Sequence, residues 1–173
     1  MKAITTILLI TGLFLLTACT SAPEGITPVK NFDLEQYKGK WYEIARLDHS
    51  FEEGMEQVTA TYTVNDDGTV KVLNKGFITK EQKWDEAQGL AKFVEGTDTG
   101  HFKVSFFGPF YGAYVIFELD QDDYQYAFIT SYNRDFLWFL SRTPTVSDEL
   151  KQHFMAKANK LGFATEQVIW VKQ

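Results

Sequence analysis

Hydrophobic and polar residues alternate along most of this chain, and this alternation restricts its fold more than any other feature. In residues 57–64, for example, every second side chain is apolar and the side chains between them are glutamine or threonine. A period of two is typical of β-strands that present one face to a core. Eight such runs follow one another, at 40–48, 57–64, 70–75, 87–94, 102–106, 113–119, 124–130 and 136–142.

Short connections join most of these runs, which predicts an antiparallel meander. An open meander of eight strands would expose two edges, whereas closure into a barrel removes them. The period then changes. Ser147 is a suitable N-cap, apolar residues recur at helical spacing up to Gly162, and a short run follows at 167–171. We therefore predict an all-β fold: an eight-stranded antiparallel up-and-down barrel, with a C-terminal α-helix packed outside it and a short final strand.

The N-terminal residues have the layout of an export signal. Lys2 precedes an apolar run at 7–16 that is too short to span a bilayer, and two small residues then lead to Cys19. This layout resembles the lipobox of bacterial lipoproteins, in which cleavage falls just before the cysteine and acyl chains are added to it. We expect a signal peptide at 1–18 and lipidation of Cys19. The alternative is an ordinary secretory signal that ends beside a cysteine.

Residues 20–30 contain two prolines and a glycine and no apolar period. This composition indicates a flexible tether between the lipidated Cys19 and a folded domain at 31–173. If fully extended, such a tether would reach roughly 35–40 Å.

Charge and cysteine content exclude several classes of function. Without Lys2, 16 basic and 23 acidic residues remain, so the processed chain carries a net charge of −7. Such a surface does not attract nucleic acid by bulk charge, and we expect no nucleic-acid partner. Cys19 is the only cysteine, so no disulfide can form within the chain. The three histidines lack the spacing of metal ligands, and we expect neither a metal site nor a cofactor.

Two segments at the ends of the predicted barrel resemble signatures of the lipocalin family. Residues 31–46 contain Gly39, Trp41 and Tyr42 in the Gly-x-Trp-Tyr pattern of the first signature, and residues 136–144 are similar to the third, centred on Arg142. With the cysteine motif and residues 104–112, the chain most resembles bacterial outer-membrane lipocalins, which are similar to apolipoprotein D. The resemblance implies a barrel with a ligand cavity, in which Gly39, Trp41 and Arg142 form a structural floor.

The connections between the predicted strands differ in composition at the two ends of the barrel. One set is short, polar and acidic, which indicates a sealed end. The other set carries Phe51, Met55, Phe110 and Tyr111, which indicates an open, apolar cavity mouth. The alternative is that Phe110 and Tyr111 fold back onto the barrel wall.

Strand parity gives a first candidate for the cavity. If Trp41 faces inward, parity turns Glu43, Ala45 and Leu47 inward as well. A buried carboxylate is costly unless it is paired. Glu43 is therefore either a structural partner near the floor or a polar contact for a ligand head group.

The resemblance to apolipoprotein D implies that Tyr62, Asn74 and Trp138 also point into the cavity. Each has a polar group beside an apolar body, as small-molecule pockets require. The alternative for Tyr62 and Trp138 is plain core filling, and for Asn74 a hydrogen bond to nearby backbone.

The resemblance implies a binding protein for a hydrophobic small molecule, in this branch a fatty acid or lysophospholipid. We expect a lipid-anchored protein at the periplasmic face of the outer membrane of a Gram-negative bacterium, serving lipid storage, transport or scavenging. We expect no enzymatic activity, although a lipocalin-type isomerase using Glu43 and Tyr62 is one alternative. A non-enzymatic envelope adaptor that uses the apolar rim is another, and the sequence leaves a homodimer open.

Overall fold

The computed structural model describes residues 20–173, so the expectations for the signal peptide at 1–18 and for Cys19 lie outside the described residues. Strands dominate the described part of the chain, as the alternation predicts. In chain order the elements are α2 (Leu34–Tyr37), β1 (Gly39–Leu47), β2 (Met55–Val64), β3 (Val70–Ile78), β4 (Lys83–Phe93), β5 (His101–Phe107), β6 (Phe110–Leu119), β7 (Tyr126–Thr130), β8 (Leu137–Ser141), α3 (Asp148–Lys160), η1 (Thr165–Gln167) and β9 (Val168–Trp170).

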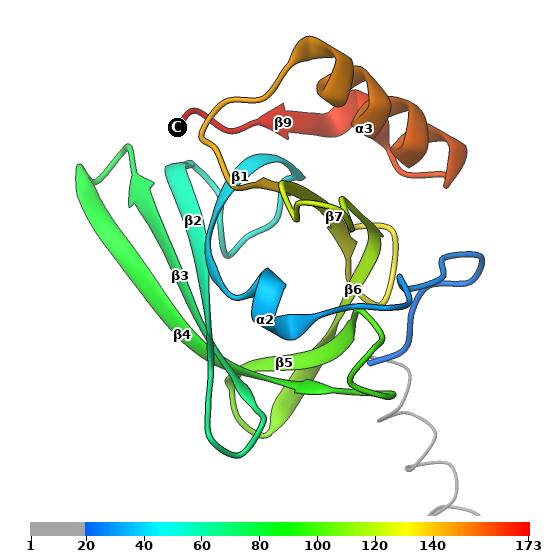
Figure 1. Cartoon of the computed structure of the whole chain (residues 1–173). Helices are drawn as coiled ribbons and strands as arrows, with labels where there is room; N and C mark the ends of the chain where they lie inside the picture. Colours follow the sequence, from blue (N-terminus) through cyan, green and yellow to red (C-terminus); the bar gives the residue numbers. More distant parts are fainter. Residues whose placement is uncertain (1–19) are drawn as a thin grey trace, which may run out of the picture.

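Strands β1 to β8 form a closed antiparallel barrel. Each strand pairs with the next, and β1 closes the ring by pairing with both β8 and β2. In Figure 1 the strands form a ring that α2 crosses, while α3 and β9 lie outside it. The predicted fold class is therefore confirmed, and each of the eight alternating runs corresponds to one barrel strand.

Helix α3 covers part of the outer wall of the barrel. It begins where the sequence predicts, because the Ser147 hydroxyl accepts a hydrogen bond from the Leu150 amide at 3.2 Å. Its apolar face buries Phe154 and Ala158 completely, and the Phe154 ring lies 4.9 Å from that of Phe128 on β7. Within residues 20–173, no helix combines the length and the apolar character needed to cross a membrane.

A β-bulge in β1 corrects part of the parity argument. The pairing of β1 with β8 shifts between Glu43 and Ala45, which reverses the alternation beyond that point. Ala45 and Leu47, which parity alone turns inward, therefore pack with Phe154 and Ala158 of α3. We call this cluster between the barrel wall and α3 the outer core. Trp41 packs with Tyr37 and Tyr62 inside the barrel, in the inner core. Strand β1 therefore contributes side chains to both cores.

The prediction of a flexible tether over 20–30 is wrong. Ile26 is buried in the outer core with an exposed fraction of 6%. The Val29 amide donates to the Ile116 carbonyl on β6 at 2.9 Å, and the Val29 carbonyl accepts from the Gly100 amide at 2.9 Å. The segment is held because its few apolar residues pack against the barrel. Its content of proline and glycine gives no indication of this packing.

The sealed end of the barrel is organised around Arg142. Its guanidinium carbon lies 3.9 Å from the centre of the fully buried Trp41 ring, the distance of a cation–π contact. The same side chain donates hydrogen bonds to the backbone carbonyls of residues 36, 37, 38, 40 and 124. Arg142 thus joins the end of β8 to α2 and to the start of β1. Gly39 adopts a φ of +96°, which favours glycine, close to this guanidinium.

Replacing Arg142 with alanine is expected to destabilise the fold without changing which ligand the protein prefers. The substitution removes the cation–π contact and five hydrogen bonds to backbone carbonyls, so we expect a loss of about 2–4 kcal/mol. Thermal unfolding measures the loss, and ligand titration of the folded variant tests the preference. R142K is the matched control, because it keeps the charge but lacks the planar fork. An unchanged midpoint in R142A would contradict the structural role.

The barrel cavity as candidate functional site

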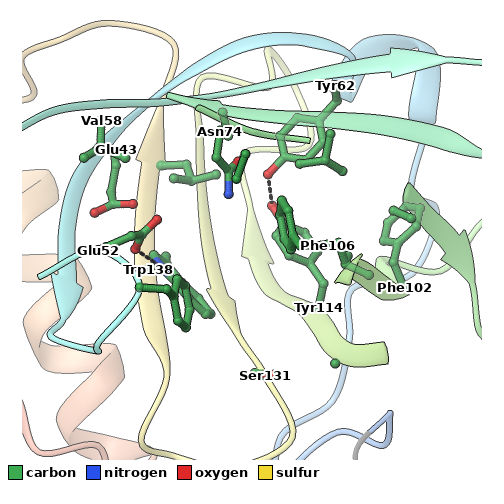
Figure 2. A pocket seen from close by; sticks show the side chains of 18 of the residues that line it. Glu43, Glu52, Val58, Tyr62, Asn74, Phe102, Phe106, Tyr114, Ser131 and Trp138 are labelled. Atoms are coloured by element: carbon green, nitrogen blue, oxygen red, sulfur yellow. Dashed lines mark hydrogen bonds between the residues drawn. The ribbon is translucent and has the colours of Figure 1, made fainter. Parts of the chain in front are cut away.

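The barrel encloses an apolar cavity of about 590 Å³ that opens at the end opposite Arg142. This volume lies within the range of small-molecule sites. Figure 2 shows side chains from several strands that converge on the space. Four predicted cavity residues line it, namely Glu43, Tyr62, Asn74 and Trp138.

The mouth of the cavity is apolar and partly exposed. Phe51, Met55 and Phe110 line it, as the sequence predicts. Tyr111 does not, because side chains alternate along β6 and Phe110 takes the inward position. The Tyr111 ring instead contacts the Lys103 ammonium group, 5.4 Å from the ring centre. The placement of Tyr111 at the mouth is therefore corrected to the outer surface.

Three tyrosine hydroxyls form a connected polar group in the deep part of the cavity. The Tyr114 hydroxyl lies 2.7 Å from the Tyr62 hydroxyl and 2.7 Å from the Tyr37 hydroxyl. Burial raises the pKa of all three phenols above the ordinary value, so they stay neutral at physiological pH. The Tyr62 hydroxyl is thus hydrogen-bonded to Tyr114, while the Tyr62 ring faces the cavity.

Asn74 brings an amide group to the middle of the cavity wall. It lies on β3 between Ala60 of β2 and Ala87 of β4, whose small side chains leave space around it. Within residues 20–173 its side chain makes no hydrogen bond, and it turns toward the cavity in Figure 2. This amide is available to a ligand group that both donates and accepts hydrogen bonds.

Trp138 is held by a carboxylate from the connection between β1 and β2. Its indole Nε1 donates to Glu52 Oε2 at 3.1 Å, and the same oxygen lies 3.1 Å from His49 Nε2. Glu52 and His49 are both buried. The Trp138 ring stacks on Phe136 with centres 5.9 Å apart. The connection therefore fixes one wall of the mouth through buried polar contacts.

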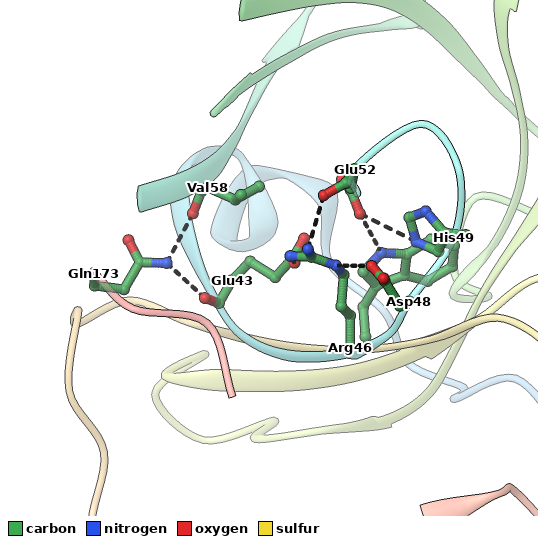
Figure 3. Close-up of polar contacts among 8 residues, drawn as sticks. Glu43, Arg46, Asp48, His49, Glu52, Val58 and Gln173 are labelled. Atoms are coloured by element: carbon green, nitrogen blue, oxygen red, sulfur yellow. Dashed lines mark hydrogen bonds and ion pairs between the residues drawn. The ribbon is translucent and has the colours of Figure 1, made fainter. Parts of the chain in front are cut away.

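Glu43 faces the cavity and is paired with Arg46 from the same strand. Arg46 Nη1 donates to Glu43 Oε1 at 2.9 Å, and Arg46 Nη2 donates to the Glu52 carbonyl at 2.7 Å, as Figure 3 shows. The bulge in β1 places the two side chains on the same side of the strand. Burial raises the pKa of Glu43 well above its ordinary value, the nearby Glu52 charge raises it further, and Arg46 opposes both effects. Glu43 thus has a structural partner and also lines the cavity, and a contact with a ligand head group stays a prediction.

The seam between β1 and β2 is completed by residues 171–173. The two strands pair only as far as Tyr42 and Thr59, and beyond that point they diverge. The Gln173 side chain bridges the gap by donating to the Glu43 carbonyl at 2.5 Å and to the Val58 carbonyl at 3.0 Å. Figure 3 shows this bridge. These two carbonyls flank the cavity, so the bridge closes the wall beside Glu43.

Sequence reasoning missed several residues of the site. Tyr114 follows from extending the alternation along β6, a step that was available. Glu52 and Arg46 were not accessible in this way, because Glu52 lies in an irregular connection and the bulge turns Arg46 inward. The isomerase alternative needs Glu43 and Tyr62 as a pair, yet each bonds to a different partner. Within residues 20–173, no cluster of three or more His, Cys, Asp and Glu side chains could hold a metal ion.

Comparison with known proteins gives consistent relatives over almost the whole chain. Residues 32–173 match the family model described as a lipocalin-like domain. The chain is 52% identical to the outer membrane lipoprotein Blc of Vibrio cholerae, covering 92% of this chain and 93% of that protein. It is 49% identical to the protein of the same name from Escherichia coli K12, covering 94% and 93%. Mouse apolipoprotein D is 31% identical, with coverage of 79% and 72%.

The buried Glu43 carboxyl is expected to make stability fall as pH rises. Because its pKa is raised in the folded state, the folded protein holds a proton that the unfolded chain releases from about pH 5 upward. One such proton contributes at most about 1.4 kcal/mol per pH unit. In E43Q the decline in the free energy of unfolding between pH 5 and 8 should therefore be smaller than in the unmodified protein.

Denaturant unfolding at several pH values measures this slope. E53Q is the matched control, because Glu53 is exposed in the same region of the chain and its substitution should leave the slope unchanged. Parallel slopes for E43Q and the unmodified protein would refute the proposed titration.

Proposed function

Because the chain belongs to the lipocalin family, we propose that it is a carrier whose barrel cavity binds a single-chain lipid, a fatty acid or a lysophospholipid. Its close bacterial relatives are named outer membrane lipoproteins, and this chain shares their location. The carrier would serve lipid storage, transport or scavenging in maintenance of the envelope. The observation that carries the proposal is the apolar cavity of about 590 Å³ with an open mouth.

The chemistry of the cavity supports an alkyl ligand. Each methylene that moves from water into an apolar site contributes about 0.8 kcal/mol, so ten buried methylenes contribute on the order of 8 kcal/mol. The polar groups that face the space are few, and the deep ones, the tyrosine hydroxyls, are already hydrogen-bonded to one another. Glu52 and Asn74, labelled in Figure 2, are two of the lining residues that bring side-chain oxygens to the cavity.

The anchor is the second part of the proposal. Acylation of Cys19 after removal of residues 1–18 would hold the domain at the periplasmic face of the outer membrane. The lipobox layout of the sequence and the lipoprotein names of the relatives support this step.

The adaptor hypothesis has one observation in its favour. Phe107 and Phe110 at the tip between β5 and β6 are 81% and 77% exposed, more than a soluble surface requires. An adaptor would use this rim to bind another envelope protein and would leave the cavity without a ligand. Measurement of ligand binding therefore separates the two functions.

Narrowing the cavity is expected to weaken lipid binding without unfolding the barrel. Ala87 lines the cavity on β4 and has space in front of it, so A87F should fill part of the ligand volume. We expect the non-acylated protein to bind lysophospholipid with micromolar or tighter affinity and A87F to bind at least tenfold more weakly. Titration followed by tryptophan fluorescence measures both, with Trp138 as the cavity reporter.

Q88F is the matched control, because Gln88 is the next residue on the same strand and points outward. It should bind like the unmodified protein. If no lipid of any chain length changes the fluorescence of the unmodified protein, the adaptor function is favoured.

Replacing Cys19 with serine is expected to release the protein from the membrane. Without the thiol no acyl chain can be attached, so C19S should appear in the soluble periplasmic fraction while its lipid affinity is retained. Fractionation and intact-protein mass measure the outcome. C19S found in the membrane fraction in unchanged amount would contradict the anchor.

A further inference from the structure

The N-terminal segment 20–30 is attached to the barrel along its whole length. We call this segment the strap. Next to Cys19, the Thr20 carbonyl accepts a hydrogen bond from Nε2 of the buried His101 at 2.8 Å. At its middle, the Glu24 carbonyl accepts from Arg134 Nη2 at 2.6 Å, and Ile26 is buried in the outer core. At its end, Lys30 bonds to Glu95 and Thr99. In Figure 1 the strap follows the outside of the barrel near β6.

Backbone hydrogen bonds and a buried side chain hold the strap against the barrel. Val29 has both of its backbone groups paired, with Ile116 on β6 and with Gly100 before β5. The Arg134 side chain also donates to the Leu161 carbonyl at 2.6 Å, so the strap shares this cation with the end of α3. Backbone pairing and burial of Ile26 together favour the attached state over a free chain.

The first held atom of the strap is only one residue from Cys19. A free segment of this length could place the barrel roughly 35–40 Å from the anchor, whereas consecutive Cα atoms are about 3.8 Å apart. His101 lies at the start of β5, on the sealed half of the barrel. Phe107 at the mouth lies at the other end of that strand, six residues away, which corresponds to roughly 20 Å.

From this geometry we infer that the strap fixes the orientation of the anchored barrel, with the sealed half next to the membrane and the mouth turned away from it. The inference rests on the proposed acylation of Cys19. The aromatic rim formed by Phe51, Phe107 and Phe110 then does not reach the leaflet that holds the anchor. Lipid would pass between the cavity and some other lipid-bearing surface, unless the strap detaches.

The experiment measures which end of the barrel lies near the lipid head groups. Acylated protein is placed in vesicles of phosphatidylethanolamine and phosphatidylglycerol that carry a head-group quencher. A fluorescent label is attached to a single new cysteine, either T97C at the sealed end or F110C at the mouth, since the thiol of Cys19 is acylated. Both positions are exposed. We expect strong quenching at 97 and at least threefold weaker quenching at 110.

A strap variant tests the cause of the orientation. I26D puts a charge into the outer core and should detach the strap, which should raise quenching at 110 toward the value at 97. T27D is the matched control, because Thr27 is the adjacent, exposed residue and should leave both values unchanged. Hydrogen exchange in the C19S protein gives an independent check: the Val29 amide should be protected, and I26D should remove that protection while amides of the barrel strands remain protected.

The outcomes separate this inference from the proposed function. Equal quenching at 97 and 110 with an intact strap overturns the orientation, as does an I26D protein whose strap exchanges freely while quenching stays as before. Intact-protein mass is measured on the same samples. Absence of acyl chains on Cys19 would overturn the anchor itself, and loss of lysophospholipid binding would overturn the carrier function.

Discussion

The contact between Arg142 and Trp41 is the interaction on which the rest of the barrel depends. It lies where the end of β8 meets the start of β1, so it acts at the point where the sheet must close on itself. The guanidinium donates hydrogen bonds to backbone carbonyls of α2 and of the turn into β1, and the indole provides an aromatic face for its charge. With one end closed by these two side chains, the other end is free to stay open, and the middle can hold a cavity instead of a packed core.

The cavity itself is apolar, and two sets of polar groups in and beside its wall are satisfied within the protein. The linked hydroxyls of Tyr37, Tyr62 and Tyr114 lie deep, where they are satisfied by one another. Glu43 and Arg46 lie nearer the opening and are joined by a buried hydrogen bond. Buried charges need partners, and here the partners come from the same strand and the following connection. A polar head group would therefore meet fixed dipoles and charges rather than flexible surface chains.

The period of two, the short connections and the change to helical spacing were sufficient to predict the barrel and α3. The signatures around Trp41 and Arg142 indicated the floor, and the three residues that the resemblance to apolipoprotein D turns inward, Tyr62, Asn74 and Trp138, line the cavity. The failures have physical causes. A bulge reverses the alternation of inward and outward side chains. Parity therefore turns Ala45 and Leu47 to the wrong face of β1 and gives no indication of Arg46. Low apolar content suggested that 20–30 is free, yet one buried side chain, Ile26, and backbone pairing suffice to hold it.

The bulge in β1 has an evolutionary consequence. Residues around the bulge face two different parts of the molecule. Glu43 and Arg46 turn toward the barrel interior, whereas the apolar side chains pack beneath α3, namely Ile44, Ala45 and Leu47. Mutations at the first pair can alter the chemistry offered to a guest molecule, and the docking of α3 would be untouched. A chain with this layout can diversify what it carries at a cost confined to two positions.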